Sequence, residues 1–143
     1  MKKIGSILRL EFLPTSVDLA LLVLRLWLGL SMLLLHGWGK AMAYKDMPKG
    51  FYDPFGVGNE VSWGLAVFAE VVCSVLLVLG LFTRIAALGC AATMATAFWY
   101  AHGGNLTGPN NGEMPFLFLG VFVALFIAGA GKYSLDAKLG AKG

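Results

Sequence analysis

The stretch VDLALLVLRLWLGLSMLLL, residues Val17–Leu35, decides the fold of this chain. Only Asp18 and Arg25 carry charge in it, and its length is close to the roughly 20 apolar residues that a helix needs to cross a bilayer. Basic residues precede it, as in a signal peptide, but the apolar run is long and no small-x-small cleavage site follows it. We therefore expect a retained transmembrane helix rather than a removed leader.

Three further apolar segments follow, at Val61–Phe82, Ile85–Ala101 and Pro115–Ala130. The whole chain is 58% hydrophobic and only 13% charged, whereas a soluble domain carries about 25% charged residues. Only the dipeptide Thr83-Arg84 joins the second and third segments, so these two are expected to be neighbouring antiparallel helices. The sequence predicts an all-α integral membrane protein, a four-helix bundle surrounded by the lipid bilayer.

The distribution of Lys and Arg predicts the orientation of this protein, which we expect to form a single domain over residues 1–143. With the N-terminus in the cytoplasm, seven of these basic residues lie on the inner side and three on the outer side, as the positive-inside rule requires. The inner residues are Lys2, Lys3, Arg9, Arg84, Lys132, Lys138 and Lys142, and the outer ones are Lys40, Lys45 and Lys49. Trp38, Trp63 and Trp99 fall at the outer helix ends, where indole rings favour the headgroup region. Both termini are therefore expected in the cytoplasm.

Two opposite charges interrupt the first two apolar segments. Arg25 and Glu70 each lie about ten residues from the predicted outer end of their helix, or about 15 Å at 1.5 Å per residue. A lone charge at the bilayer centre costs at least roughly 2.5–3.5 kcal/mol on insertion scales, so two opposite charges at one depth should pair. We expect a buried Arg25–Glu70 ion pair. Two roles fit it: a staple that fixes helix register, and a proton-responsive or ligand-binding polar core.

The outer end of the first helix carries a histidine and a lysine. His36 follows Arg25 at a helical spacing that places both side chains on one face. Histidine titrates near neutral pH, so His36 and Lys40 are candidates for an outer site that accepts a proton from a quinol-like substrate. The alternatives are a helix-end histidine bonded to headgroups or backbone, and a lysine whose ammonium group snorkels to the interface.

The sequence contains no motif for metal binding or for nucleic acid binding. Neither CxxC nor zinc-ligand spacing occurs, and Cys73 and Cys90 both lie in apolar runs, so we expect no metal site. The basic residues gather at the ends of apolar runs, so no nucleic acid partner is expected. Small residues repeat every four positions in the third and fourth segments, which favours close helix packing. They are Ala87, Ala91 and Ala95, and Gly120, Ala124 and Ala128.

Several of these segments resemble the DoxX family of small four-helix membrane proteins of bacteria. In the first helix the resemblance rests on LRLWLG, residues 24–29, and on HGWGK, residues 36–40. In the second it rests on Ala69-Glu70 followed by LGLFTR, residues 79–84. The stretch GAGKYSLD, residues 129–136, is similar to the family's closing signature. We expect a helix-end signature made of Arg84, from residues 79–84, and of Ser134 and Asp136, from residues 129–136.

The family is named after a subunit associated with terminal quinol oxidase and thiosulfate:quinone oxidoreductase complexes. The resemblance therefore implies an accessory subunit of a quinone-linked respiratory or redox complex in the bacterial cytoplasmic (inner) membrane. Other membrane subunits would be its partners, and a homo-oligomer is compatible with the sequence. The alternatives are a non-catalytic structural or assembly subunit and a small transporter. Apart from a quinone, we expect no cofactor on this chain alone, and we do not expect a self-sufficient enzyme.

Overall fold

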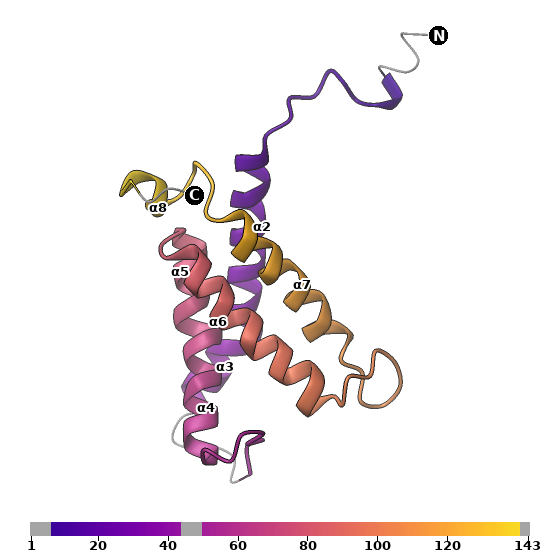
Figure 1. The fold of residues 1–143 in the computed structure, drawn as a ribbon, viewed down its shortest axis with the longest axis vertical. Coiled ribbons are helices and arrows are strands. Elements are labelled where there is room, and N and C mark those ends of the chain that lie inside the picture. The colour runs from indigo at the N-terminus through magenta and orange to yellow at the C-terminus, as the bar shows by residue number, and fades with distance from the viewer. Residues whose placement is uncertain (1–6, 44–49, 141–143) are drawn as a thin grey trace.

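The computed structural model describes residues 7–43 and 50–140, and in these ranges the chain is helical without any strand (Figure 1). The all-α class is therefore confirmed for the part of the chain that is described. The elements are α2 (Val17–Ser31), η1 (Met32–Gly37), α3 (Trp38–Met42), α4 (Asn59–Val67), η3 (Phe68–Cys73), α5 (Ser74–Leu79), α6 (Thr83–Thr96), η4 (Ala97–Ala101), α7 (Glu113–Ala128) and α8 (Leu135–Lys138). The η elements are π-helical turns that continue the α-helices before them.

Two of the helical segments are long and apolar enough to cross a membrane. They are Val17–Met42, which joins α2, η1 and α3, and Asn59–Leu79, which joins α4, η3 and α5. The apolar helix α7 is shorter, at 16 residues. Length and composition thus support membrane-spanning helices, as the sequence predicts.

The first helix runs further than predicted. It begins after the N-cap Ser16, whose hydroxyl accepts a hydrogen bond from the amide of Leu19, and it continues past Leu35 to Met42. The predicted span ended at about Leu35, where the apolar run ends. Gly37 is helical, however, and it is buried where this helix touches the second one. A glycine at a helix contact permits close packing instead of ending the helix.

The other helix ends also differ from the predicted spans. The second helix ends at Leu79 rather than Phe82, because Gly80 takes a left-handed conformation at φ +68°, which glycine adopts without steric cost. The third therefore begins earlier than predicted, at Thr83. Helix α7 begins at Glu113 and ends before Gly129, at φ +81°.

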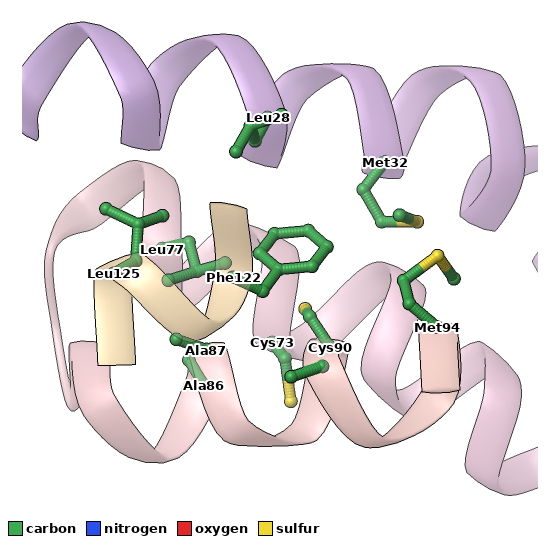
Figure 2. Packing of buried hydrophobic residues seen from close by; sticks show 11 residues of the cluster. Leu28, Met32, Cys73, Leu77, Ala86, Ala87, Cys90, Met94, Phe122 and Leu125 are labelled. Atoms are coloured by element: carbon green, nitrogen blue, oxygen red, sulfur yellow. The ribbon is translucent and has the colours of Figure 1, made fainter. Parts of the chain in front are cut away.

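The buried core lies where α6 meets α7 and where the first two helices pack on each other (Figure 2). Its large members are Leu28, Met32, Leu77, Met94, Phe122 and Leu125, and its smaller ones are Cys73, Ala86, Ala87, Cys90 and Ala91. The small side chains of α6 let the neighbouring helices approach closely. The expected packing role of Ala87 and Ala91 is confirmed, because both are buried in this core.

The second stripe of small residues behaves differently from the first. Gly120, Ala124 and Ala128 are exposed on α7, and a Cβ added at Gly120 would meet no atom within 4 Å. Close packing is thus found for the small residues of α6 but not for those of α7, which matches the alternative that one of the two repeats faces outward. The second stripe lies on the face of α7 that points away from the core.

Large apolar side chains cover the outward faces of the helices. Trp27 is 73% exposed, Leu35 75%, Ile85 72% and Ile127 69%. Soluble monomers rarely expose large contiguous apolar patches, whereas lipid tails are a favourable environment for such faces. The exposed surface is thus consistent with contact to a lipid bilayer.

Candidate functional site

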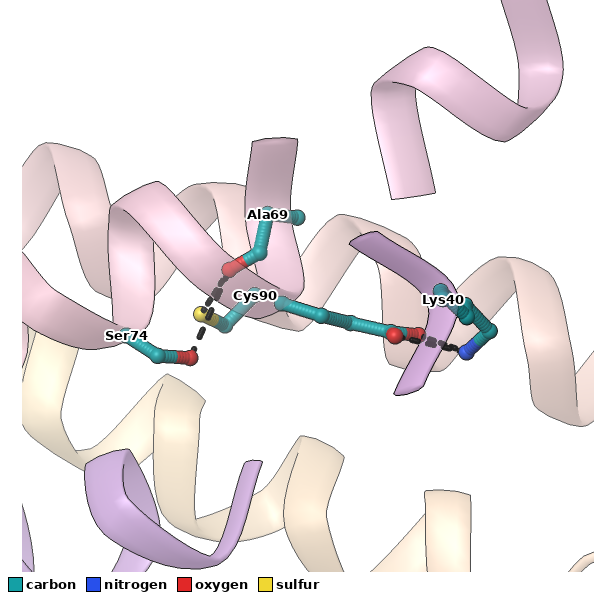
Figure 3. Close-up of polar contacts among 5 residues, drawn as sticks. Lys40, Ala69, Ser74 and Cys90 are labelled. Carbon is teal, nitrogen blue, oxygen red and sulfur yellow. Dashed lines mark hydrogen bonds and ion pairs between the residues drawn. The ribbon is translucent and has the colours of Figure 1, made fainter. Parts of the chain in front are cut away.

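A buried ion pair joins the first two helices. The ammonium group of Lys40, on α3, donates to both carboxylate oxygens of Glu70, on η3, at 2.7 and 2.6 Å (Figure 3). The side chain of Glu70 is 5% exposed and that of Lys40 29%. A carboxylate this deeply buried needs a charged partner, and Lys40 reaches it from the end of the first helix.

The pair forms where the two helices touch most closely. Gly37 lies one turn before Lys40, and a Cβ at Gly37 would stand 2.5 Å from the carbonyl oxygen of Glu70. Only glycine therefore fits this contact. Because the backbone of the first helix rests directly on the backbone of η3, the lysine one turn later is within reach of the carboxylate.

The predicted Arg25–Glu70 ion pair is not formed. Arg25 is fully buried, but its guanidinium group donates to the carbonyl oxygen of Leu77, at 3.2 Å, and to that of Tyr133. Since the first helix continues to Met42, Gly37 rather than Arg25 lies opposite Glu70. Twelve residues separate Gly37 from Arg25, which is about 18 Å along a helix. Both charges are buried, as expected, but they serve two different sites.

Arg25 belongs to a cluster at the opposite end of the helix pair. Gly80 lies against it, and a Cβ there would stand 2.2 Å from Nη1 of Arg25 and 2.6 Å from Cβ of Ser134. The guanidinium group thus bonds the last turn of α5 and the segment after α7 at once. This cluster joins the C-terminal segment to the first two helices.

The residues of the predicted helix-end signature lie at this same end. The carboxylate of Asp136 accepts hydrogen bonds from the amides of Phe82, at 2.8 Å, and Thr83, at 2.9 Å, and so caps the start of α6. Ser134 caps α8 by accepting from the amide of Ala137. Arg84 donates to the carbonyl oxygen of Ile127, at 3.2 Å. The three residues therefore connect helix ends, and they are far from the Lys40–Glu70 pair along the helices.

Asp136 lies outside the apolar helices, and its pKa reflects its capping role. Partial burial raises the pKa of this carboxyl, but the amides of Thr83 and Phe82 and the nearby charge of Arg25 lower it more. The net pKa is below the ordinary value for aspartate. The ionised carboxylate therefore contributes stability to the folded state.

His36 lies one turn before Lys40, in η1. Its ring is half-buried and packs edge-on against Phe118 of α7, with ring centroids 6.0 Å apart. No hydrogen bond from its imidazole is recorded in the described ranges, and residues 7–43 and 50–140 contain no group of three potential metal ligands. His36 thus lies one turn from Lys40 of the ion pair, and its ring contacts α7.

A cavity of about 510 Å³ opens beside Glu70, between the second helix and the third. A volume of this size suits a small organic ligand. Its described walls are mostly apolar, and the charged residue among them is Glu70. Glu70 also belongs to the contact between the first and second helices. The lining residues include Phe51, Phe55, Leu65, Ala69, Gly89 and Ala97. The cavity was not predicted from the sequence. The signal for it was the combination of small residues on α6 with an aromatic connection, which together leave space between helices.

An aromatic segment covers one end of the cavity, and a single carboxylate holds it. Asp53 accepts from the amides of Val57 and Gly58, at 3.1 and 2.7 Å, and from the hydroxyl of Ser62, at 2.8 Å. These bonds lower the pKa of Asp53, with the Ser62 hydroxyl as the largest cause. On either side of Asp53, Phe51 packs edge-on against Trp63 and Phe55 against Tyr100. These contacts hold residues 51–58 in place beside the cavity.

In the described ranges, three π-helical turns lie near the Lys40–Glu70 pair and the cavity. η1 precedes Lys40, η3 contains Glu70, and η4 carries Ala97 and Ala101 of the cavity wall. Within η3 the carbonyl oxygen of Ala69 accepts from Sγ of Cys90, at 3.4 Å, which ties α6 to the second helix (Figure 3). π-turns often occur at functional sites, because they displace side chains that a regular helix would space evenly. Their position here marks the same site as the ion pair and the cavity.

The geometry gives this site a definite chemistry. The carboxylate of Glu70 accepts from Lys40 on both oxygens, and Glu70 lines a mostly apolar cavity. Each carboxylate oxygen has lone pairs for further hydrogen bonds. Such a group binds hydroxyl or N–H donors, or accepts a proton. Lys40, one of the two residues of the predicted outer site, thus pairs with Glu70, whereas Arg25 lies elsewhere.

Comparison with known proteins agrees with the segments quoted from the first two helices. The DoxX family profile matches residues 20–103, more than half of the chain, and this range includes Lys40, Glu70 and most of the cavity wall. The closing signature at residues 129–136 lies beyond the matched range.

Two proteins of Haemophilus influenzae, both described as uncharacterized, are similar to the chain. One is 36% identical over 112 residues, covering 75% of this chain and 81% of the relative. The other is 27% identical over 105 residues, covering 71% and 70%. No solved structure matches the chain. The family profile and the first of these relatives together establish that this chain belongs to the DoxX family.

Proposed function

We propose that this protein is a multi-pass protein of the bacterial inner membrane, a four-helix bundle with both termini in the cytoplasm, and an accessory subunit of a quinone-linked redox complex. The observation that carries the proposal is the carboxylate of Glu70, which is held by Lys40 at the wall of an apolar cavity. A lipid-soluble ring fits such a cavity, and a carboxylate can bind or deprotonate its hydroxyl group. The exposed apolar helix faces support the membrane location.

The accessory role is supported by the apolar character of the described helices, which leave short turns such as residues 80–82 between them. The described connections are short, except for the segment around residues 50–58 and the loop before α7. An apolar protein of this kind can present a ligand to a partner within the membrane. Electron transfer would then take place in a larger complex, to which this chain contributes a ligand site.

The test is purification of the native complex through a tag on this chain, in a mild detergent. We expect a redox-active partner to be purified with it, together with quinone-dependent electron transfer. The variant Glu70→Gln should lower turnover per complex while the partner is retained. Glu113→Gln, which changes an exposed carboxylate at the start of α7 in the same way, serves as the matched control. A homo-oligomer without redox activity would contradict the proposal.

A second candidate is a structural or assembly subunit, and the close contact at Gly37 favours it. The contact joins two backbones beside the ion pair, so Lys40 and Glu70 would then fix helix register only. In that case Glu70→Gln lowers the amount of assembled complex, but turnover per complex stays unchanged. The same purification therefore separates the two candidates.

A further inference from the structure

Among the described residues, the wall of the cavity presents one charged side chain, that of Glu70, and its carboxylate only accepts hydrogen bonds. A carboxylate offers about four lone-pair positions, and the Lys40 ammonium occupies one on each oxygen of Glu70. Acceptor positions therefore remain on the carboxylate, and Glu70 is one of the residues that line the cavity between the second and third helices. A ligand that reaches the carboxylate from the cavity meets a negative, acceptor-only group.

The other polar groups of the wall do not offset this preference. The hydroxyl of Ser62 donates to Asp53, at 2.8 Å, and that of Thr96 donates to the carbonyl oxygen of Ala92, at 2.9 Å. The hydroxyl groups of Tyr52 and Thr93 both donate and accept, so neither discriminates between a donor and an acceptor on the ligand. Glu70 thus decides which polar group a ligand can place at this wall.

The remaining surface of the cavity is apolar and partly aromatic. Phe51, Phe55 and Phe68 line it together with leucine and alanine side chains, and the ring contacts of Phe51 and Phe55 hold their positions. Aromatic walls favour a planar ring, which packs against them in offset or edge-on geometry. A ligand with an apolar ring and a hydroxyl group fits both the cavity and the carboxylate.

From these contacts we infer that the cavity is a selective binding site for lipid-soluble hydroxylated rings, of the phenol and hydroquinone class, whose hydroxyl group donates to Glu70. A ligand that offers only acceptors, such as an aryl ether or a ring carbonyl, places its lone pairs against the carboxylate and binds more weakly. The inference rests on and deepens the proposed function, since it assigns the reduced, hydroxyl-bearing form of a quinone to this site. It is tested on the purified chain, so its outcome does not depend on a partner complex.

The experiment compares two ligands that differ only in the donor. The protein is reconstituted in lipid nanodiscs, and 4-octylphenol and its methyl ether, 4-octylanisole, compete with tritiated 4-octylphenol, with empty nanodiscs as the background. A charge-assisted hydrogen bond predicts that the phenol binds about tenfold or more tightly than the ether. In Glu70→Gln the ratio should fall to near one, because the amide group donates as well as accepts.

Two further variants keep the result decisive. Ala92→Leu fills the cavity from α6, and it should weaken both ligands while their ratio is kept. The double variant K40M/E70M removes both charges of this pair without leaving one unpaired. It therefore gives the ratio without the carboxylate if Glu70→Gln does not fold. Equal affinity of the two ligands for the unchanged protein would overturn the inference, as would a preference that persists without the carboxylate. Failure of the partner purification with the tenfold ratio intact would overturn the proposed function alone.

Discussion

Lys40 and Glu70 form an ion pair in which both carboxylate oxygens accept from one ammonium group, at 2.7 and 2.6 Å, although Glu70 is almost fully buried. The two residues come from different helices and meet beside a backbone contact at Gly37. Glu70 also lines the cavity, so the residue that carries the ion pair belongs to the helix contact and to the candidate ligand site.

The first prediction concerns the stability of this pair. Lys40→Met leaves a buried carboxylate without a counter-charge, which should cost about 3–5 kcal/mol of unfolding free energy. The double variant K40M/E70M removes both charges and should recover most of this loss. The measurement is SDS-induced unfolding in detergent micelles, analysed as a double-mutant cycle. Additive effects of the two single substitutions would show that the charges are not coupled.

The second prediction tests the helix contact with a matched pair of glycines. A Cβ at Gly37 would stand 2.5 Å from the backbone of Glu70, whereas a Cβ at Gly39 would meet no atom within 4 Å. Gly37→Ala should therefore destabilise the protein by about 1–3 kcal/mol, because the helices must move apart. Gly39→Ala should be neutral or slightly stabilising, since alanine favours a helix. Equal unfolding midpoints for the two variants would argue against the contact.

A third prediction concerns the turn that receives Arg25. Gly80 and Gly140 both have positive φ angles, +68° and +78°, but only Gly80 lies against Arg25 and Ser134. Gly140→Ala should lower the unfolding free energy by about 1–2 kcal/mol at most, which is the cost of alanine in a left-handed conformation. Gly80→Ala should cost clearly more, because the new methyl group also displaces the guanidinium group. Thermal unfolding of the two variants gives the difference, and equal losses would rule out a tight fit around Arg25.

The fourth prediction is a pH dependence at the start of α6. The folded-state pKa of Asp136 is below its ordinary value, so its contribution to stability is fully present above the unfolded pKa of about 3.9 and is lost as the pH falls through the lower folded value. Asp136→Asn should therefore be less stable than the unchanged protein at pH 5–7, and this difference should narrow in acid. Unfolding midpoints across the pH range measure it. A difference that stays constant down to the lowest pH would contradict the capping role.

A fifth prediction addresses the segment that covers the cavity. Asp53 holds the amides of Val57 and Gly58, so Asp53→Ala should speed hydrogen exchange at these two positions. Glu60→Gln changes an exposed carboxylate a few residues further on and should leave the exchange unaffected. Mass spectrometry of peptides that cover residues 51–58 gives the rates. Unchanged protection in Asp53→Ala would mean that the aromatic contacts hold the segment without the carboxylate.

The signature at the C-terminal end illustrates what could be predicted in part. Ser134 and Asp136 were recognised as a motif, but only the structure shows that they cap helices and surround Arg25 with Gly80. Capping partners 53 residues apart in sequence, as for Asp136 and Thr83, depend on how the chain returns to the start of α6. Periodicity within one segment carries no information about such a return.

The sequence by itself determined the helical class, the apolar segments and the identity of the two buried charges, because length and hydropathy act locally. Only the tertiary structure decided which charges pair. Gly37 continues the first helix instead of ending it, so the register between the first two helices shifts, Lys40 reaches Glu70, and Arg25 turns to backbone carbonyls. The physical reason is that the close approach at Gly37 is a contact between two helices, and a contact of that kind is set by the surfaces of both partners.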